Sequence, residues 1–94
     1  MTLVILWSAQ ARRQFLASLS HIASEDPAAA DLVVKRVGKS LHTLCEFPEL
    51  GTPAAMAGVR RYPVPKTGHC FDYRVVRGEI RIQRWYRQRQ QPSA

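Results

Sequence analysis

The sequence predicts an α+β fold in the order β-α-α-β-β-β, with an N-terminal helical hairpin packed on one face of a small, mainly antiparallel sheet. Three observations predict it. A short apolar run opens the chain, apolar residues with helical spacing follow, and segments with strand-like alternation come last. We expect a single domain over residues 1–94, because a chain of 94 residues with 46% hydrophobic residues fills one small core and not two.

The first expected elements are a strand over residues 3–7 and a helix over residues 9–23. The run from 3 to 7 is apolar and too short for a helix, which is typical of a buried strand. Ser8 is in position to cap the helix that follows. Apolar residues then recur every three or four positions and form one helical stripe: Ala11, Phe15, Leu19 and Ile22.

A second helix is expected from Pro27 to about residue 47. Asp26 is its N-cap, and Pro27 takes the first helical position, where the missing N–H costs nothing. Because only a few residues link the two helices, they should pack antiparallel, and Gly38 is expected to let the first helix approach closely. Residues 48–58 contain Pro, Gly and small residues, and we expect a loop there.

Strands are expected over residues 59–64, 71–76 and 79–87. The last two alternate apolar and polar residues. Residues 77–78, Arg-Gly, predict a tight hairpin turn between them, with glycine supplying a positive φ. The segment 88–94 shows no pattern and is expected to be a flexible tail.

Positive charge is concentrated in the C-terminal half of the chain. Residues 48–94 carry nine Lys and Arg residues against three acidic ones, which is +6 of the net charge of +7. A basic sheet favours a polyanion or an acidic polypeptide as its partner. The residues expected to bind a target or a partner protein are Arg60, Arg61, Lys66, Arg74, Arg81, Arg84, Trp85, Arg87 and Arg89.

Strand alternation also predicts the directions of the last aromatic side chains. If Ile80 and Ile82 face the core, Arg84 and Tyr86 face inward as well, and Trp85 faces outward. An outward Trp among arginines is in position to stack on a base or to contact a partner side chain.

The sequence predicts no cofactor and no metal site. Two His and two Cys residues have side chains that can ligate zinc, but they lack the paired spacing of a zinc site: His42, Cys45, His69 and Cys70. The adjacent His69 and Cys70 should project to opposite sides of a strand. Neither a Ser/His/Asp signature nor a Gly-rich phosphate loop is present.

Composition and the N-terminal residues predict a cytoplasmic protein that does not enter a membrane. The first residues lack the basic segment of a signal peptide. No apolar run approaches the length of about 20 residues that a membrane helix needs. Two cysteines fit a reducing compartment, where buried thiols behave as small apolar groups.

Several short motifs follow one another in a specific order along residues 3–90. They are Trp7-Ser8 with Ala11-Arg12, Asp26-Pro27-x-Ala29-Ala30, Leu44-x-x-Phe47-Pro48-Glu49-Leu50-Gly51, Val59-Arg60-Arg61-Tyr62-Pro63-Val64, Phe71-x-Tyr73-Arg74-Val75 and Ile80-x-Ile82-x-Arg84. In order and spacing they resemble the ParE/RelE superfamily of toxins from type II toxin–antitoxin modules, and more closely its ParE branch. The β-α-α-β-β-β order of that superfamily is the order predicted above.

The resemblance implies a toxin that a cognate acidic antitoxin neutralises in a hetero-oligomeric complex. ParE-like members imply inhibition of DNA gyrase by binding, without catalysis, and the absence of a clear catalytic set favours this reading. RelE-like members imply an alternative, a metal-independent endoribonuclease that cuts mRNA on the ribosome; its residues here would be Arg61, His69, Arg84 and Tyr86. A second alternative is an inactive toxin that acts only within an antitoxin-bound autoregulatory complex.

The chain departs from the superfamily pattern in three places. Family members often have Gly-Arg where Gly51-Thr52 stands, and Tyr at the position of His69. They often end in a His-Gly-Arg-Arg type of sequence, where this chain has Arg87-Gln88-Arg89-Gln90. These departures weaken the expectation of nuclease activity.

Overall fold

The computed structural model describes residues 3–90 and has the predicted α+β architecture. Its elements are β1 (Val4–Trp7), α1 (Ala9–Glu25), α2 (Pro27–Glu46), β2 (Thr52–Pro53), β3 (Arg60–Val64), β4 (His69–Val76), β5 (Glu79–Arg87) and a 3₁₀ turn (Gln88–Gln90). The order β-α-α-β-β-β is confirmed, with one addition. A two-residue strand, β2, lies within the segment that we expected to be entirely loop.

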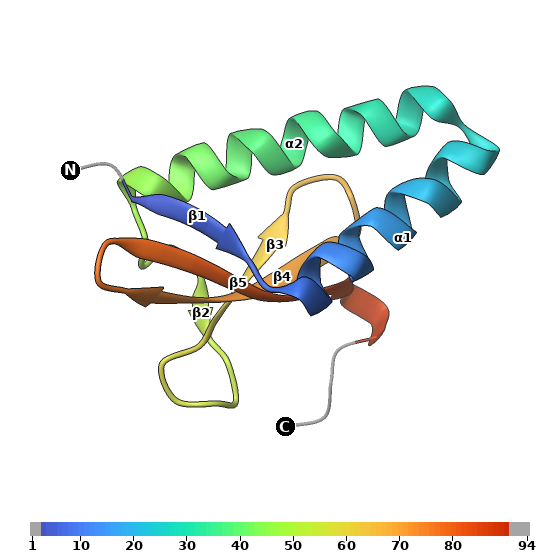
Figure 1. Ribbon diagram of the computed structural model, residues 1–94. Helices are drawn as coiled ribbons and strands as arrows, with labels where there is room; N and C mark the ends of the chain where they lie inside the picture. The colour runs from blue at the N-terminus through green and yellow to red at the C-terminus, as the bar shows by residue number, and fades with distance from the viewer. Residues whose placement is uncertain (1–2, 91–94) are drawn as a thin grey trace.

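All five strands form one mixed sheet in the order β1-β5-β4-β3-β2. Strand β1 runs parallel to β5, and the other neighbouring strands are antiparallel. Helices α1 and α2 lie together on one side of this sheet (Figure 1). The sheet therefore has one face covered by the helical hairpin and an opposite face that is available for other contacts.

The hairpin of α1 and α2 turns at a single residue, Asp26, rather than at the few residues expected. The backbone N–H of Asp26 donates to the carbonyl of Ile22 (2.8 Å) and ends α1. Its carboxylate accepts from the N–H groups of Ala28 (3.1 Å) and Ala29 (3.3 Å) and begins α2, as the capping pattern predicted. Pro27 occupies the first turn of α2.

A β-bulge in β5 reverses the direction of the side chains that follow it. Asp72 pairs with Arg84, while the next residue of β4, Tyr73, pairs with Ile82, so Gln83 is the extra residue. Because of this extra residue Trp85 points to the helix side, where it is 2% exposed. The expectation that Trp85 faces outward, available to a partner, is therefore wrong.

Trp85 fastens α1 to the sheet. Its indole N–H donates to the Ser18 hydroxyl (3.0 Å), and its backbone N–H donates to the Gln14 side chain (2.9 Å). Its ring meets Phe15 edge to face with the centroids 4.8 Å apart. The buried cluster around it consists of Ala11, Val33, Val37, Leu44, Val64, Phe71, Tyr73, Ile80 and Ile82.

The C-terminal hairpin and the segment after it differ in how well they were predicted. Arg77 (φ 45°) and Gly78 (φ 82°) are both in the left-handed region, which confirms a tight turn of the kind that suits twisted strands. The segment from Gln88 is not entirely irregular, since residues 88–90 form a 3₁₀ turn and the Gln88 N–H donates to the Gly68 carbonyl (2.9 Å). The remainder of the expected tail, 91–94, lies outside the described residues.

Gly38 does not bring the two helices into close contact. A Cβ atom added at this position would meet no heavy atom within 4 Å, so the expected close approach is wrong. Replacing Gly38 with Ala should raise the free energy of unfolding by about 0.5–1 kcal/mol, because alanine loses less backbone entropy in a helix interior. Denaturant unfolding of both proteins tests this prediction, and a lower stability of Gly38→Ala would contradict it.

Candidate functional site

The face of the sheet opposite the helices gathers basic side chains from three strands. The strand register sets Arg61, Asp72 and Arg84 side by side on β3, β4 and β5. Arg74 and Arg81 lie directly opposite each other, a like-charge pair that is unfavourable unless an anion is nearby. We call this side the open face and define it by Arg61, Cys70, Asp72, Arg74, Arg81, Arg84 and Tyr86.

A hydrogen-bonded network occupies the centre of the open face. The Arg61 Nε–H donates to the Tyr86 hydroxyl (2.6 Å), and that hydroxyl donates to Oδ1 of Asp72 (2.8 Å). Arg61 Nε also lies 3.6 Å from the same carboxylate oxygen. Asp72 is only 8% exposed, so these donors compensate a nearly buried negative charge.

The surroundings of Tyr86 keep its phenol protonated. Burial raises the pKa of Tyr86, and the hydrogen bond that the phenol donates to Asp72 raises that pKa further. Beneath Tyr86, the fully buried Cys70 has its thiol pKa raised, also chiefly by burial. At neutral pH the centre of the open face therefore presents a phenol that retains its proton and an inert thiol.

Two arginines of the open face are left without an ionic partner. Arg81 pairs with Glu79 at 2.8 Å, and Arg61 belongs to the central network. Within residues 3–90, neither Arg74 nor Arg84 forms an ion pair, and both are partly exposed. Their guanidinium groups are therefore free to bind phosphate or carboxylate from outside the chain.

The structure divides the residues proposed for a nuclease between two faces. Arg61, Arg84 and Tyr86 share the open face, but His69 is on the helix side of β4. The His69 ring stacks on Trp85 with the centroids 5.1 Å apart, and its Nδ1 lies 3.1 Å from the Thr67 carbonyl. His69 is only 7% exposed, so it packs as a core residue away from the other three.

The remaining predicted binding residues lie elsewhere in the fold. Arg60 donates to the carbonyl of Gly51 (2.7 Å) and stabilises the loop before β2. Lys66 is in the turn between β3 and β4, and Arg87 lines a cleft beside His69. Arg89 is exposed in the 3₁₀ turn.

No role was assigned to Asp72 from the sequence. The available signal was an acidic residue on a central strand whose neighbouring strands carry arginines at the matching positions. Reading that signal requires the register of three strands, because Asp72 contacts Arg61 and Tyr86 across both of its neighbours.

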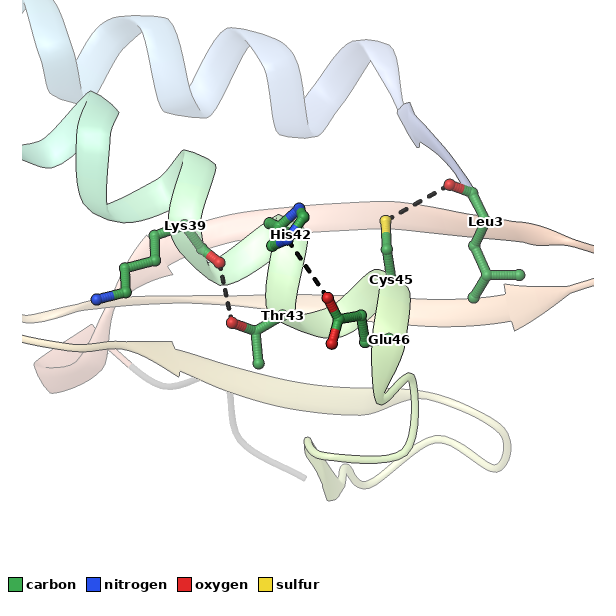
Figure 2. A network of polar contacts seen from close by, with 6 residues as sticks. All are labelled: Leu3, Lys39, His42, Thr43, Cys45 and Glu46. Atoms are coloured by element: carbon green, nitrogen blue, oxygen red, sulfur yellow. Dashed lines mark hydrogen bonds and ion pairs between the residues drawn. The ribbon is translucent and has the colours of Figure 1, made fainter. Parts of the chain in front are cut away.

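No metal site is formed by the residues that the structure describes. Within 3–90, no three His, Cys, Asp or Glu side chains gather in a way that could hold an ion. His42 instead lies 3.4 Å from Glu46 on the exposed side of α2, and the Cys45 thiol contacts the Leu3 carbonyl at 3.5 Å (Figure 2). Cys70 lies on the open face, and both cysteines are free thiols.

Comparison with known proteins identifies the family. A family model described as the ParE toxin of the type II toxin–antitoxin system, parDE, matches residues 5–92. The chain belongs to the ParE toxin family. Membership confirms the resemblance inferred from the motifs, and the parDE family implies an antitoxin as partner.

Two relatives agree with membership in the ParE family. One is named "Putative toxin Y4kP", from Sinorhizobium fredii (strain NBRC 101917 / NGR234); it is 30% identical over 73 residues, which are 78% of this chain and 76% of the relative. The other is a solved structure of the chromosomal ParDE TA system from P. aeruginosa. It matches with a TM-score of 0.79 at 22% identity and covers 92% of this chain and 96% of its own, which shows the same fold.

The helices of this ParE-family protein do not have the composition of membrane spans. Among the described residues, none of them combines the length and the apolar character needed to cross a bilayer.

Burial of His69 predicts a pH-dependent stability. Burial lowers the His69 pKa, the nearby Arg87 charge lowers it further, and the Thr67 carbonyl partly offsets both. Below about pH 6.5 the unfolded chain then binds a proton that the folded chain does not, so the free energy of unfolding falls as the pH decreases. The contribution has a slope of at most about 1.4 kcal/mol per pH unit.

Comparing unfolding curves of the wild type and His69→Gln between pH 7.5 and pH 5 isolates this contribution. We expect the variant to lose less stability than the wild type over this range. The exposed His21 provides a control, since His21→Gln should follow the wild type. Parallel pH profiles for wild type and His69→Gln would show that the histidine titrates equally in the two states.

Proposed function

We propose that this ParE-family toxin inhibits DNA gyrase by binding it through the open face, without catalysis, and that a cognate antitoxin neutralises it. The observation that carries the proposal is the central network of the open face. Tyr86 is held between Arg61 and Asp72. Arg84 pairs with Asp72 across the two strands, and Arg74 lies on the same face two residues beyond Asp72. This arrangement favours recognition of an anionic surface over proton transfer.

General acid–base catalysis requires a group that exchanges its proton near the working pH. The Tyr86 phenol has a raised pKa and already donates its proton to Asp72. His69 lies on the other side of the sheet against Trp85. A binding function needs neither group to titrate, because arginines alone supply charge and paired donors.

An apolar groove between the helical hairpin and β1 supports the proposed antitoxin contact. It encloses about 560 Å³, and Gly38 widens it by having no side chain. Leu6, Leu16 and Val34 line it and are between 43% and 52% exposed, which is unusual for large apolar residues unless a partner covers them. Arg12 lies at the same groove, so an amphipathic antitoxin segment with an acidic residue at its rim fits both features.

Expression without the antitoxin tests the proposal in cells. We expect DNA-damage signalling and filamentation, because inhibited gyrase no longer maintains the supercoiling of cellular DNA. We also expect co-expression of the antitoxin to restore growth. Normal growth on antitoxin-free expression would count against an active toxin and favour a protein that acts only in an autoregulatory complex.

One observation favours a second candidate function, the mRNA endonuclease. Arg61, Arg84 and Tyr86 do share the open face, as a cationic site for an RNA phosphate would require. Primer extension on a translated message distinguishes the two functions. The gyrase proposal predicts no codon-phased cuts, whereas cuts that vanish in Tyr86→Phe would assign catalysis to this face.

A further inference from the structure

A basic cleft opens on the helix side of the molecule, between α2 and the turn that joins β3 to β4. It encloses about 280 Å³ and is separate from the open face. Its described lining residues are Arg36, Lys39, Ser40, Thr43, Tyr62, Pro65 and Lys66. Three of these side chains are cationic, and none carries a carboxylate or a carboxamide.

The two walls of the cleft are fastened to each other. The guanidinium of Arg36 on α2 donates to the Lys66 carbonyl in the turn (3.0 Å). Lys66 itself has a φ of 61°, a left-handed conformation that a lysine adopts only when its surroundings hold it there. The contact to Arg36 therefore holds the backbone of the turn against α2.

Ser40 supplies a hydroxyl to the lining of this cleft. The residue is 4% exposed, and among the described residues no buried side-chain oxygen or nitrogen lacks a hydrogen-bond partner. The neighbouring Thr43 hydroxyl donates to the Lys39 carbonyl at 3.1 Å (Figure 2). The Ser40 hydroxyl lines the cleft and can donate to an acceptor from outside the chain.

We propose that this cleft binds a phosphate group of a nucleic-acid backbone. A phosphodiester carries acceptor oxygens and a negative charge, which match the ammonium groups of Lys39 and Lys66 and the hydroxyl of Ser40. A peptide segment would bring backbone N–H groups that need acceptors, and the lining side chains offer only hydroxyls for them. One turn of an α-helix, about 10–12 Å wide, is also too large for the volume.

Phosphate binding in the cleft is independent of the proposed gyrase contact. The cleft is on the helix side and the gyrase contact is assigned to the open face, so each can be disabled while the other is kept. The test uses DNA without gyrase, and its failure would leave the gyrase proposal intact.

Salt-dependent binding to a DNA duplex of arbitrary sequence tests the cleft directly. The full chain is titrated onto a labelled duplex of about 20 base pairs at several salt concentrations, and the slope of log Kd against log[salt] is measured. Each phosphate that the protein neutralises contributes about 0.9 to that slope. The proposed site neutralises one phosphate, so the double variant Lys39→Gln/Lys66→Gln should reduce the slope by about 0.9. Both lysines are exposed, so the fold does not depend on their charges.

A matched control removes the same charge elsewhere. Arg13 and Lys35 are exposed helix residues that do not line the cleft, and Arg13→Gln/Lys35→Gln should keep the wild-type slope. Ser40→Ala removes a neutral donor, so it should weaken binding about tenfold at every salt concentration while the slope is unchanged. Equal slopes for the two double variants would overturn the proposal. The proposal would also be overturned if the Lys39→Gln/Lys66→Gln variant bound a glutamate-rich peptide more weakly than the wild type does but bound DNA with the wild-type affinity.

Discussion

Replacing Gly51 with Ala is expected to lower the free energy of unfolding by about 3–5 kcal/mol. Gly51 is buried, and a Cβ atom there would lie 2.7 Å from the Tyr73 hydroxyl and 2.8 Å from the backbone carbonyl oxygen of Arg61. Neither neighbour can move freely, because one is backbone within β3 and the other is a fully buried phenol.

The same substitution would also break the hydrogen bonds that close this end of the sheet. The Gly51 N–H donates to the Tyr73 hydroxyl (2.9 Å), which in turn donates to the Pro48 carbonyl (2.7 Å). Denaturant unfolding measures the loss. Gly38→Ala is the control, since the identical chemical change in open space should stabilise the protein. If Gly51→Ala lowers the free energy of unfolding by less than about 1 kcal/mol, the loop relaxes, and the close contact of residue 51 with Tyr73 and Arg61 is not needed.

Removing two charges from the open face should sharply weaken gyrase inhibition. In Arg74→Gln/Arg84→Gln we expect the concentration for half-inhibition of supercoiling to rise about 100-fold, which corresponds to about 2.7 kcal/mol. The fold should persist, because within the described residues neither arginine is in an ion pair, and losing Arg74 relieves its repulsion with Arg81.

The control for this variant is again Arg13→Gln/Lys35→Gln, which removes the same net charge from exposed positions on the helices. We expect it to inhibit gyrase as the wild type does. If both double variants weaken inhibition equally, the effect reflects net charge alone, and the open face would not be the binding surface.

Local spacing was enough to predict most of the fold. Helical periodicity, the capping residue Asp26 and the turn at Arg77-Gly78 each act over a few residues, and the structure confirms them. The bulge at Gln83 could not be predicted in this way, because contacts from distant residues accompany it. The Ser8 hydroxyl donates to the Gln83 carbonyl (3.1 Å). Two residues later, the backbone N–H of Trp85 donates to the Gln14 side chain.

The candidate site was predictable in composition and not in arrangement. Charge counting found the basic sheet, and Arg61, Arg74, Arg81 and Arg84 do share one face of it. Charge counting could not distinguish these arginines from Arg60, whose guanidinium donates to a carbonyl of the loop before β2. The error at Trp85 followed from the bulge, since one extra residue exchanges the two faces of a strand.

A supercoiling assay with purified components shows whether this protein inhibits gyrase by binding it. Relaxed plasmid, gyrase and ATP are combined with increasing amounts of this protein, with and without its antitoxin. We expect that supercoiling stops as the protein saturates gyrase, that the antitoxin restores it, and that mRNA on ribosomes stays uncut in parallel reactions. Normal supercoiling at saturating protein would contradict the account, most clearly if the same preparation cut the message in phase with its codons.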